Sequence, residues 1–507
     1  MRVLFYISAI ILLFTSAHYS IGQENDSTFG HIQAIKDATS ASTFKNAVIS
    51  ICIMGLDGDK KLGINEDKML VPASNMKLIS TGTALHELGP DFRFKTEIQY
   101  DGEIKDGTLH GNLYIKGGAD PTLGSKDTIA TDIETTFSKW KMFLDEAGIN
   151  RIEGAVIGDG SWLNGMSEEE SWMWNDIGTY YGSGVTGLMF YENMQSFIAR
   201  PGLAEGDPVD LTPSYPDAPW MEFRYTCTTG KPKTGDRLYM YTSDLAPVAE
   251  IRGTFGIDRG SKRVDCSNKF PEYTCAYYFS KWLEQKGITC SEGPADLKLT
   301  RPIQITEDSL RTTAGTTTSP SLGKIAFTTN HASNNLYAET LLRALGKEFK
   351  HDSSYDSSYV AIKDILKRLM PESDKGIRIQ DGSGLSRQNL VSADFFCRFL
   401  MAMTESPHFS CFMESLPTPG GNGTLRYNMG RTPENIRKRI RVKSGSMSGI
   451  RCYSGYIMPS EQCDGWSAKT APEGTLVFSM MVNNCTVPDW EIRKALDKVM
   501  ELAASLN

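Results

Sequence analysis

The sequence has little of what builds a metal site and, after its first two dozen residues, no long apolar run. Only seven histidines occur, and none of the ten cysteines forms a C-x-x-C motif. Because zinc sites draw on closely spaced cysteines and histidines, we expect no metal and no cofactor. No later window approaches the ~20 apolar residues that a membrane span needs, which excludes a membrane-spanning body.

Excess positive charge is also absent. Lysine and arginine number 53 against 61 aspartates and glutamates, giving a net charge of -8 and a pI near 5.6. Nucleic-acid binding draws most of its affinity from clustered basic residues, so a nucleic-acid partner is not expected. The short basic run 437–439 is interpreted as a solvated face.

The chain is too long for one ordinary hydrophobic core. Domains usually hold about 100–200 residues, and this chain has 507. Its hydrophobic fraction of 40% and charged fraction of 22% are typical of a soluble globular protein. We therefore expect two or three domains.

The N-terminus has the pattern of a secretory signal peptide. Met1 and Arg2 precede an apolar run over residues 3–14, and Ser20 and Gly22 supply small residues before Gln23. We expect residues 1–22 to be a signal peptide cleaved near Gly22/Gln23, with a buried N-terminal helix as the alternative. Export permits disulfides among the ten cysteines, but their pairing stays open.

Hydrophobic periodicity divides the rest of the chain into three parts. Residues 47–70 predict a β-hairpin, followed by a helix that starts at Ser74 and stops before Gly89. Residues 100 to 300 are rich in turns and β patterns and resemble inserted domains. Helical patterns then resume, three β runs follow, and a last helix is expected to pack against a sheet. These later elements are expected at residues 334–345, 356–370, 439–442, 452–458, 475–483 and 490–506.

Ser74 and Lys77 form the pattern S-x-x-K at the start of that first helix. Three residues apart on a helix, the amine can reach the hydroxyl. A serine hydroxyl becomes a good nucleophile only when a base takes its proton, and a lysine can be that base if its pKa falls. The pattern alone is weak, because it recurs at Ser42, Ser138 and Ser321.

Two later triplets, which must follow in order, supply the context that S-x-x-K alone lacks. The sequence Ser333-Asn334-Asn335 opens a helical segment, with a hydroxyl to relay protons and an amide to hold a substrate backbone. Lys443-Ser444-Gly445 follows a β run and offers a cation and a strand edge. Lys233-Thr234-Gly235 and Tyr191-Glu192-Asn193 imitate these triplets but come in the wrong order or context.

Longer motifs carry a resemblance to a known family. In these motifs the chain resembles the class C low-molecular-mass penicillin-binding proteins. This is the D-alanyl-D-alanine carboxypeptidase/endopeptidase family of penicillin-binding protein 4 type. A long insertion between Lys77 and Ser333 is typical of this family and absent from ordinary β-lactamases. The motifs lie at residues 71–77, 117–123, 333–339, 381–386, 416–417, 423–426 and 443–446.

The resemblance implies the fold. It implies an α/β (α+β) protein whose penicillin-binding transpeptidase/β-lactamase-like domain has an antiparallel sheet flanked by helices, with two inserted β-rich domains. We expect the catalytic domain at residues 23–100 and 300–507. The inserted domains are expected at 101–170 with 260–299, and at 171–259.

The resemblance also implies five catalytic residues. Ser74 would attack the carbonyl between two D-alanines after Lys77 takes its proton, forming an acyl-enzyme. Ser333 would pass a proton to the leaving amine, and Asn335 would hold the peptide backbone. Lys443 would bind the leaving carboxylate and help to lower the pKa of Lys77.

Four further residues are expected to bind substrate. Ser444 stands where the family usually has threonine, and its hydroxyl would assist carboxylate binding. Gly445 lies on the strand edge, and the backbone N–H of Ser446 would join that of Ser74 in an oxyanion hole. Asp159, in an Asp-Gly turn, would meet the amino group of the stem peptide, with an ordinary turn as the alternative.

The expected partners are therefore peptidoglycan peptides and β-lactam antibiotics, and the expected location is the periplasm. A β-lactamase is one alternative, although no E-x-x-L-N motif supplies a deacylating glutamate. A non-catalytic cell-wall binding protein is another, but the set of five catalytic residues is intact. The balance of carboxypeptidase and endopeptidase activity, and the oligomeric state, stay open.

Overall fold

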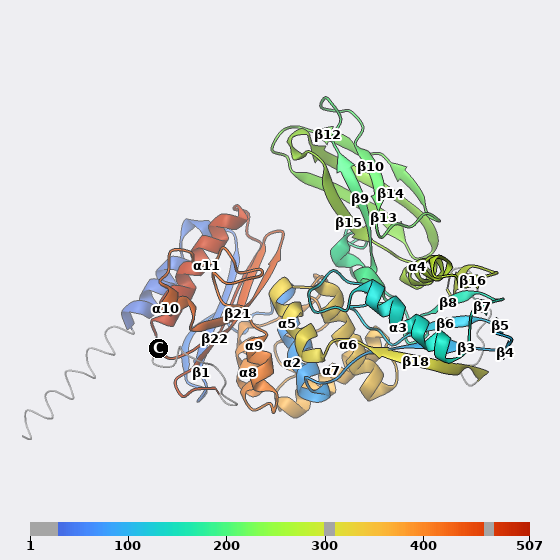
Figure 1. The fold of residues 1–507 in the computed structure, drawn as a ribbon. Coiled ribbons are helices and arrows are strands. Elements are labelled where there is room, and N and C mark those ends of the chain that lie inside the picture. The colour runs from blue at the N-terminus through green and yellow to red at the C-terminus, as the bar shows by residue number, and fades with distance from the viewer. Residues whose placement is uncertain (1–28, 299–309, 461–470, 507) are drawn as a thin grey trace, which may run out of the picture. The chain divides into compact units, whose positions relative to one another are not determined.

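The computed structural model describes residues 29–298, 310–460 and 471–506, so the expected signal peptide lies outside the described residues. The chain divides into two compact units (Figure 1). Unit 1 comprises Met1–Asn75, Glu372–Arg378 and Leu390–Asn507, and unit 2 comprises Met76–Pro371 and Ile379–Asn389. No helix among the described residues is long and apolar enough to cross a membrane.

Unit 1 is built on a five-stranded antiparallel sheet that joins the two ends of the chain. Its strand order is β2-β1-β23-β22-β21. All eight residues of β23 are buried, because this central strand is covered on both faces. The strands are β1 (Val48–Gly55), β2 (Lys60–Ile64), β21 (Ile440–Met447), β22 (Ile450–Ile457) and β23 (Leu476–Asn483). The expected hairpin and the three expected C-terminal β runs are confirmed.

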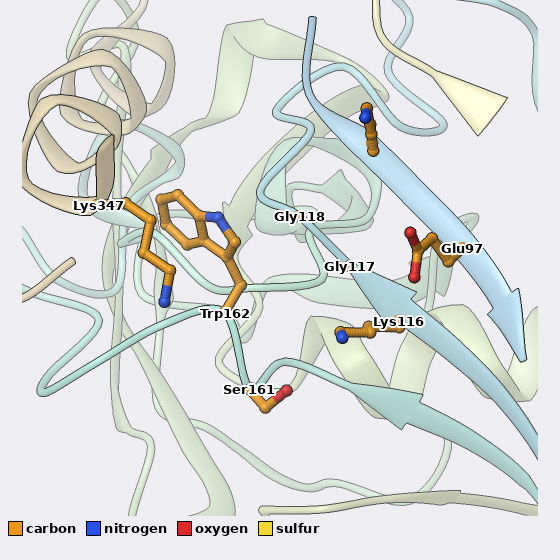
Figure 2. Close-up of a pocket in the computed structure, with 8 residues that line it drawn as sticks. Glu97, Lys116, Gly117, Gly118, Ser161, Trp162 and Lys347 are labelled. Atoms are coloured by element: carbon orange, nitrogen blue, oxygen red, sulfur yellow. The ribbon is translucent and has the colours of Figure 1, made fainter. Parts of the chain in front are cut away.

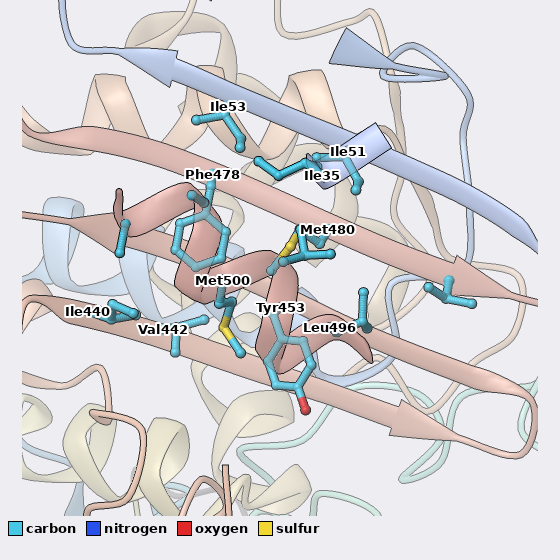
Figure 3. Close-up of a cluster of buried hydrophobic side chains, with 14 of the residues drawn as sticks. Ile35, Ile51, Ile53, Ile440, Val442, Tyr453, Phe478, Met480, Leu496 and Met500 are labelled. Carbon is cyan, nitrogen blue, oxygen red and sulfur yellow. The ribbon is translucent and has the colours of Figure 1, made fainter. Parts of the chain in front are cut away.

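Helices pack against this sheet through an apolar core. The last helix, α11 (Asp489–Ala504), contributes Leu496 and Met500 to a cluster with Tyr453, Phe478 and Met480 of the sheet (Figure 3). The expected packing of the C-terminal helix on the sheet is therefore confirmed. Helix α8 (Ala393–Thr404) contacts β1, β22 and β23. Unit 1 also contains a helix over residues 29–39 and the short helices α9 (Phe409–Glu414) and α10 (Glu434–Arg437).

The helical part of unit 2 consists of four helices in mutual contact. Helix α2 packs on α5, α6 and α7, and α6 packs on α7. The four helices are α2 (Lys77–Leu88), α5 (Leu322–Ala332), α6 (Asn335–Lys350) and α7 (Tyr355–Leu369). The first begins at Lys77 and not at Ser74, because residues Ala73–Met76 form a separate 3-10 turn.

A mixed sheet with its own core forms the next part of unit 2. Its strand order is β17-β8-β6-β3-β18, and its apolar core includes Trp140 and Phe279 of two covering helices. The strands and helices are β3 (Lys95–Tyr100), β6 (Leu113–Gly117), β8 (Val156–Asp159), β17 (Pro294–Asp296), β18 (Thr312–Thr318), α3 (Ile133–Glu146) and α4 (Pro271–Gln285). A smaller sheet has the order β16-β7-β5-β4, from β4 (Glu103–Lys105), β5 (Thr108–His110), β7 (Arg151–Ile152) and β16 (Thr289–Cys290).

A third part of unit 2 is almost entirely β. One sheet has the order β10-β9-β15, a second is built around β14, and a separate apolar core lies between residues 197 and 270. The strands are β9 (Met194–Arg200), β10 (Asp210–Ser214), β11 (Glu222–Tyr225), β12 (Thr228–Gly230), β13 (Asp236–Ser243), β14 (Ala246–Gly256) and β15 (Lys262–Ser267). The domain boundaries expected from the sequence stay a prediction.

Nine of the ten cysteines lie in the described residues, and each is a free thiol. Seven of them are buried. The structure therefore holds its cores together by packing, as a chain of this length can.

Replacing Phe478 with alanine should destabilise unit 1. The ring is fully buried, and such truncations cost about 3–5 kcal/mol because apolar contacts are lost and a cavity remains. Trp490→Ala is the control in the same unit, since its side chain is 57% exposed. Urea unfolding should show a clearly lower midpoint for Phe478→Ala alone. Equal midpoints for both variants would contradict this core.

Candidate active site

Ser74 lies in a short 3-10 turn that stands out from its buried surroundings. Ala73 before it and Asn75 after it are fully buried, whereas Ser74 is partly exposed. Ala73 has a φ of 46°, in the left-handed region that a residue with a Cβ rarely adopts. Such a conformation costs of order 1–3 kcal/mol and persists only where the surroundings fix it. The turn therefore presents one hydroxyl on a constrained backbone.

Polar side chains of the sheet of unit 1 hold this segment in place. Asn483 of β23 accepts a hydrogen bond from the Val71 N–H (3.0 Å) and donates one to the Val71 carbonyl (3.1 Å). Asn75 donates to Ser454 Oγ (2.8 Å), which bonds Ser479 Oγ (2.8 Å). These contacts fix the backbone on both sides of Ser74.

The edge strand β21 passes close to the backbone of Ser74. A Cβ at Gly445 would lie 2.6 Å from the Pro72 carbonyl oxygen and 3.0 Å from the Ser74 nitrogen. Glycine is therefore required here by close approach, which the sequence pattern alone did not explain. Ser446, the next residue, is exposed.

The two other residues of this strand singled out from the sequence are buried. Lys443 is fully buried and donates to the Ser444 carbonyl (2.7 Å). Ser444 donates its hydroxyl to Thr424 Oγ1 (3.1 Å), in the segment of residues 423–426 that carried part of the resemblance. Unit 1 thus brings Ser74 together with the strand of residues 443–446.

Lys77 is the centre of a buried polar cluster in unit 2. Its Nζ donates to Asn335 Oδ1 (2.7 Å) and to the Ser383 carbonyl (2.7 Å). Burial lowers the pKa of Lys77 to about 7, against the opposing effect of the Asp381 and Glu339 carboxylates. Near neutral pH a substantial fraction of the amine is therefore uncharged and able to accept a proton.

The junction of α5 and α6 presents Ser333 and Asn335. Ser333 ends α5 in the left-handed conformation, with a φ of 58°, and Asn334 caps α6 by accepting from the Tyr337 N–H (3.1 Å). Asn335 is the first residue of α6, and its Nδ2 donates to the Tyr181 carbonyl (2.9 Å). The sharp turn between the helices therefore separates Ser333 from Asn335, which binds Lys77, by a single residue.

Two buried carboxylates, to which the sequence assigned no role, shape the loop around Ser383. Glu339 lies one helical turn after Asn335 and accepts from the Ser383 N–H (2.7 Å). Asp381 accepts from the Trp172 indole (2.9 Å) and the Gly384 N–H (2.7 Å). Burial raises the pKa of Glu339 to about 8, and burial also raises the pKa of Asp381. The position of Glu339 four residues after Asn335, and that of Asp381 at the start of an Asp-Gly-Ser-Gly turn, were the available signals.

Asp159, expected to contact substrate, is occupied by an ion pair. It lies at the end of β8, 2.5 Å from Arg311 Nη1, and both side chains are 2% exposed. The guanidinium also stacks on the Tyr114 ring, 3.8 Å from its centroid. The substrate role of Asp159 stays a prediction, with a structural partner now identified.

Asp176 is a further buried carboxylate near this cluster, and no sequence motif pointed to it. It accepts from the Tyr181 hydroxyl (3.1 Å), and the carbonyl of Tyr181 binds Asn335. Burial raises the pKa of Asp176, while Arg387 acts to lower it. Asp176 is thus linked by contacts to the cluster around Lys77.

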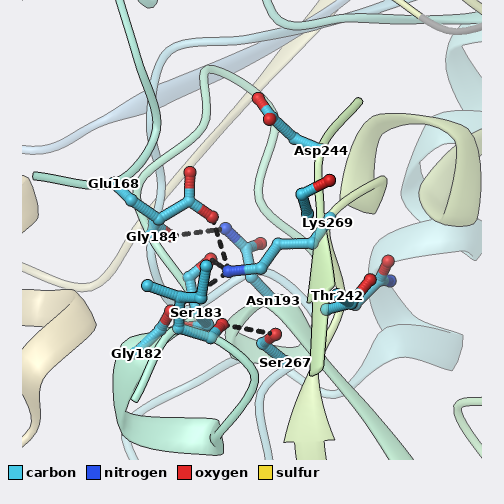
Figure 4. Close-up of polar contacts among 12 residues, drawn as sticks. Glu168, Gly182, Ser183, Gly184, Asn193, Thr242, Asp244, Ser267 and Lys269 are labelled. Carbon is cyan, nitrogen blue, oxygen red and sulfur yellow. Dashed lines mark hydrogen bonds and ion pairs between the residues drawn. The ribbon is translucent and has the colours of Figure 1, made fainter. Parts of the chain in front are cut away.

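A buried ion pair supports the loop that carries Tyr181. Lys269 lies 2.5 Å from Glu168 Oε1 and donates to the Gly182 carbonyl (3.1 Å), as Figure 4 shows. Burial lowers the pKa of Lys269, and the Glu168 carboxylate opposes that effect. The loop after Tyr181 is therefore held in place by residues of unit 2, to which the loop itself belongs.

The decoy motifs lie on other elements. Ser138 is an exposed residue within α3, and Ser321 caps α5. Lys233 lies between β12 and β13, and Tyr191 starts a 3-10 turn. None of these four is a residue of the two clusters described above.

Comparison with known proteins identifies the family of the chain. The model of the D-Ala-D-Ala carboxypeptidase 3 (S13) family matches residues 32–505. The chain is 26% identical over 454 residues to a D-alanyl-D-alanine carboxypeptidase of Actinomadura sp. (strain R39), covering 85% of this chain and 76% of the relative. It is 23% identical over 408 residues to the D-alanyl-D-alanine carboxypeptidase DacB of Haemophilus influenzae, covering 78% of each.

Solved structures confirm the expected fold class. The crystal structure of penicillin-binding protein 4 (dacB) from Haemophilus influenzae aligns with a TM-score of 0.76 at 20% identity, covering 93% of this chain and 98% of that one. A structure of the same protein with a β-lactam bound aligns with a TM-score of 0.70 at 18% identity, covering 92% and 97%. The mixed α/β fold and the resemblance to penicillin-binding proteins are both confirmed. With a family model matching nearly its whole length, the chain belongs to the D-Ala-D-Ala carboxypeptidase 3 (S13) family of serine hydrolases.

Proposed function

We propose that this family member cleaves D-Ala-D-Ala peptides of peptidoglycan through an ester on Ser74, with Lys77 as general base. The observation that carries this proposal is the buried amine of Lys77, which donates to Asn335 Oδ1 (2.7 Å) and the Ser383 carbonyl (2.7 Å) and whose pKa burial lowers to about 7. Lys77 follows three residues after a partly exposed serine on a constrained turn. A base with a pKa near the working pH combines a useful neutral fraction with a real affinity for the proton.

The reaction begins when Lys77 Nζ takes the proton of Ser74 and the serine oxygen attacks the carbonyl carbon. The backbone N–H groups of Ser74 and Ser446 stabilise the oxyanion of the tetrahedral intermediate. The C–N bond then breaks, Ser333 delivers its hydroxyl proton to the departing amine of D-alanine, and the proton held by Lys77 Nζ restores the Ser333 hydroxyl. Water hydrolyses the resulting ester and restores the serine.

Substrate is held by the residues that surround these groups. Asn335, whose amide is fixed between Lys77 and the Tyr181 carbonyl, supports the peptide backbone. Lys443 and the Ser444 hydroxyl bind the terminal carboxylate, and the edge strand that contains Gly445 offers backbone groups to an extended peptide. Whether the bond lies at a peptide end or in a cross-link does not alter these roles.

The same proposal includes location and partners. We infer export through the expected signal peptide, residues 1–22, and action in the periplasm on peptidoglycan peptides. β-Lactams react because their strained amide resembles the D-Ala-D-Ala bond. A β-lactamase is the competing function, and turnover of the drug distinguishes the two.

Benzylpenicillin should form a stable ester on Ser74, because the opened ring leaves its amine tethered in the site. Brief exposure followed by intact-protein mass spectrometry and peptide mapping should find one adduct, on the peptide that contains Ser74. Ser138→Ala, an S-x-x-K serine on α3, is the control and should label normally. An adduct at Ser42 or Ser321 would overturn the assignment, and rapid release of hydrolysed drug would favour a β-lactamase.

The acylation rate should rise with pH through about 7 and then level off. Below the pKa of Lys77 the amine is protonated and cannot accept the serine proton, so the rate falls about tenfold per pH unit. Lys77→Arg, which keeps its proton, should lower acylation by at least about 100-fold at every pH. Stopped-flow acylation by a chromogenic β-lactam measures both. A flat profile from about pH 5 to 8.5 would exclude Lys77 as the base.

Asp176→Asn and Asp159→Asn should separate substrate binding from stability. If Asp176 meets a free amino group of the stem peptide, its amide should lower kcat/KM about tenfold for substrates with that group and little for N-acetylated ones. Asp159→Asn removes the partner of a buried guanidinium and should cost about 3–5 kcal/mol of stability. The role expected for Asp159 would be supported instead if Asp159→Asn, and not Asp176→Asn, abolished the difference in kcat/KM between free and N-acetylated substrates.

A further inference from the structure

A charged cleft of about 290 Å³ lies in unit 2, apart from the cluster around Lys77. Figure 2 shows strands β3 and β6 on one side, the loop after β8 below, and α6 opposite. Its lining residues include three lysines and one tryptophan. They are Lys95, Glu97, Lys116, Gly117, Gly118, Ser161, Trp162 and Lys347.

The cleft is positive on a protein that is negative as a whole. Lys95, Lys116 and Lys347 face it together with one carboxylate, that of Glu97, while the whole chain carries a net charge of -8. Lys95 and Glu97 alternate on β3 and so share a face of the sheet. Lys116 stands directly opposite Glu97 in the β3–β6 register and shares that face. The geometry favours an anionic ligand.

Trp162 gives the cleft an aromatic wall. Its ring lies beside the Lys347 side chain, whose Nζ is 5.9 Å from the ring centroid (Figure 2). A tryptophan combines a large apolar face with a polar N–H, which suits a ligand with both apolar and polar groups, such as a sugar ring. Lysines beside an indole therefore fit a saccharide that carries carboxylates.

The loop that holds Trp162 is fixed before any ligand binds. Ser353 Oγ donates to the Trp162 carbonyl (2.9 Å) and accepts from the Asn164 N–H (2.7 Å). The buried guanidinium of Arg343 donates to the carbonyls of Asn164 (2.8 Å) and Met166 (3.0 Å). A preformed wall lowers the ordering cost of binding.

The position of the cleft along α6 sets its relation to the catalytic cluster. Asn335 begins this helix and Lys347 lies near its end, twelve residues later, a separation of about 18 Å along the helix axis. An extended peptide of five residues spans at most about 17 Å. A ligand reaching from one place to the other is therefore larger than the dipeptide being cut.

We propose that this cleft binds the carboxylate-bearing sugar–peptide part of peptidoglycan that lies beyond the bond being cut. The inference rests on the proposed function, because that function supplies a polymeric substrate with free carboxylates. The cleft then raises affinity for polymer without acting on the chemistry at Ser74. Short peptides, which cannot reach it, gain nothing from it.

The test compares polymeric and short substrates in the full chain. Changing Lys95, Lys116 and Lys347 together to serine should lower hydrolysis of purified sacculi by about tenfold or more at low salt. Hydrolysis of a short D-Ala-D-Ala peptide should stay within about twofold of the original rate. Lys363→Ser, at an exposed lysine of α7, is the matched control and should change neither rate. Unchanged hydrolysis of sacculi by the triple variant would overturn the proposal.

Binding measurements then identify the ligand chemistry. With Ser74→Ala to prevent turnover, a disaccharide-peptide with free carboxylates should bind more weakly to the triple variant and to Trp162→Ala. If Ser74→Ala bound this compound no more tightly than the same compound with amidated carboxylates, a role for the lysines would be excluded. An N-acetylglucosamine oligomer that binds as well as the anionic compound would also contradict the proposal.

Failure of the cleft and failure of the proposed function give different results. Benzylpenicillin labelling of Ser74 in the unchanged protein tests the function without involving the cleft. If labelling occurs and sacculi are still cut by the triple variant at the original rate, only the cleft is refuted. Loss of labelling and of short-peptide hydrolysis in the triple variant would show that the lysines support the fold or the catalytic cluster.

Discussion

The proposed chemistry depends on keeping the amine of Lys77 buried. Burial removes the water that would stabilise the charged form, while the Asn335 amide oxygen and the Ser383 carbonyl supply hydrogen-bond acceptors. Those acceptors are themselves held by other buried groups. Glu339 fixes the loop of Ser383 from one side, and Tyr181 fixes Asn335 from the other. The lowered pKa of Lys77, the proposed general base, thus depends on a network of buried groups that holds its hydrogen-bond acceptors in place.

The candidate catalytic residues could be named from the sequence because three motifs on separate elements occur together. All four S-x-x-K patterns precede the S-x-N and K-S-G triplets, so order alone does not choose between them, and Ser74 is the one that lies in the longer motif of residues 71–77 that carries the family resemblance. The strands and the last helix could also be predicted, since hydrophobic periodicity follows from which face is buried. Motifs and hydrophobic periodicity are both properties of short stretches of the chain, so a single sequence displays them.

Other features could not be predicted because they depend on contacts between distant segments. Nothing near Ala73 announces its positive φ, which is imposed by Asn483 and Ser454 holding the chain on either side. The resemblance implies a substrate contact for Asp159, yet Arg311, far along the chain, pairs with it. The side chain of Asp176 is linked to Asn335 through Tyr181. Local sequence patterns do not show which distant residues a side chain will contact.

The central place of β23 has a consequence for when the enzyme becomes competent. This strand separates β1 from β22, and its residues Ser479 and Asn483 anchor the segment around Ser74. Synthesis runs from the N-terminus, so Ser74, the proposed nucleophile, emerges from the ribosome about 400 residues before the strand that anchors its segment. Until β23 is made, the hydrogen bonds of Asn483 with Val71 and of Ser479 with Ser454 cannot form. A chain interrupted shortly before its end would therefore lack the support of its proposed nucleophile.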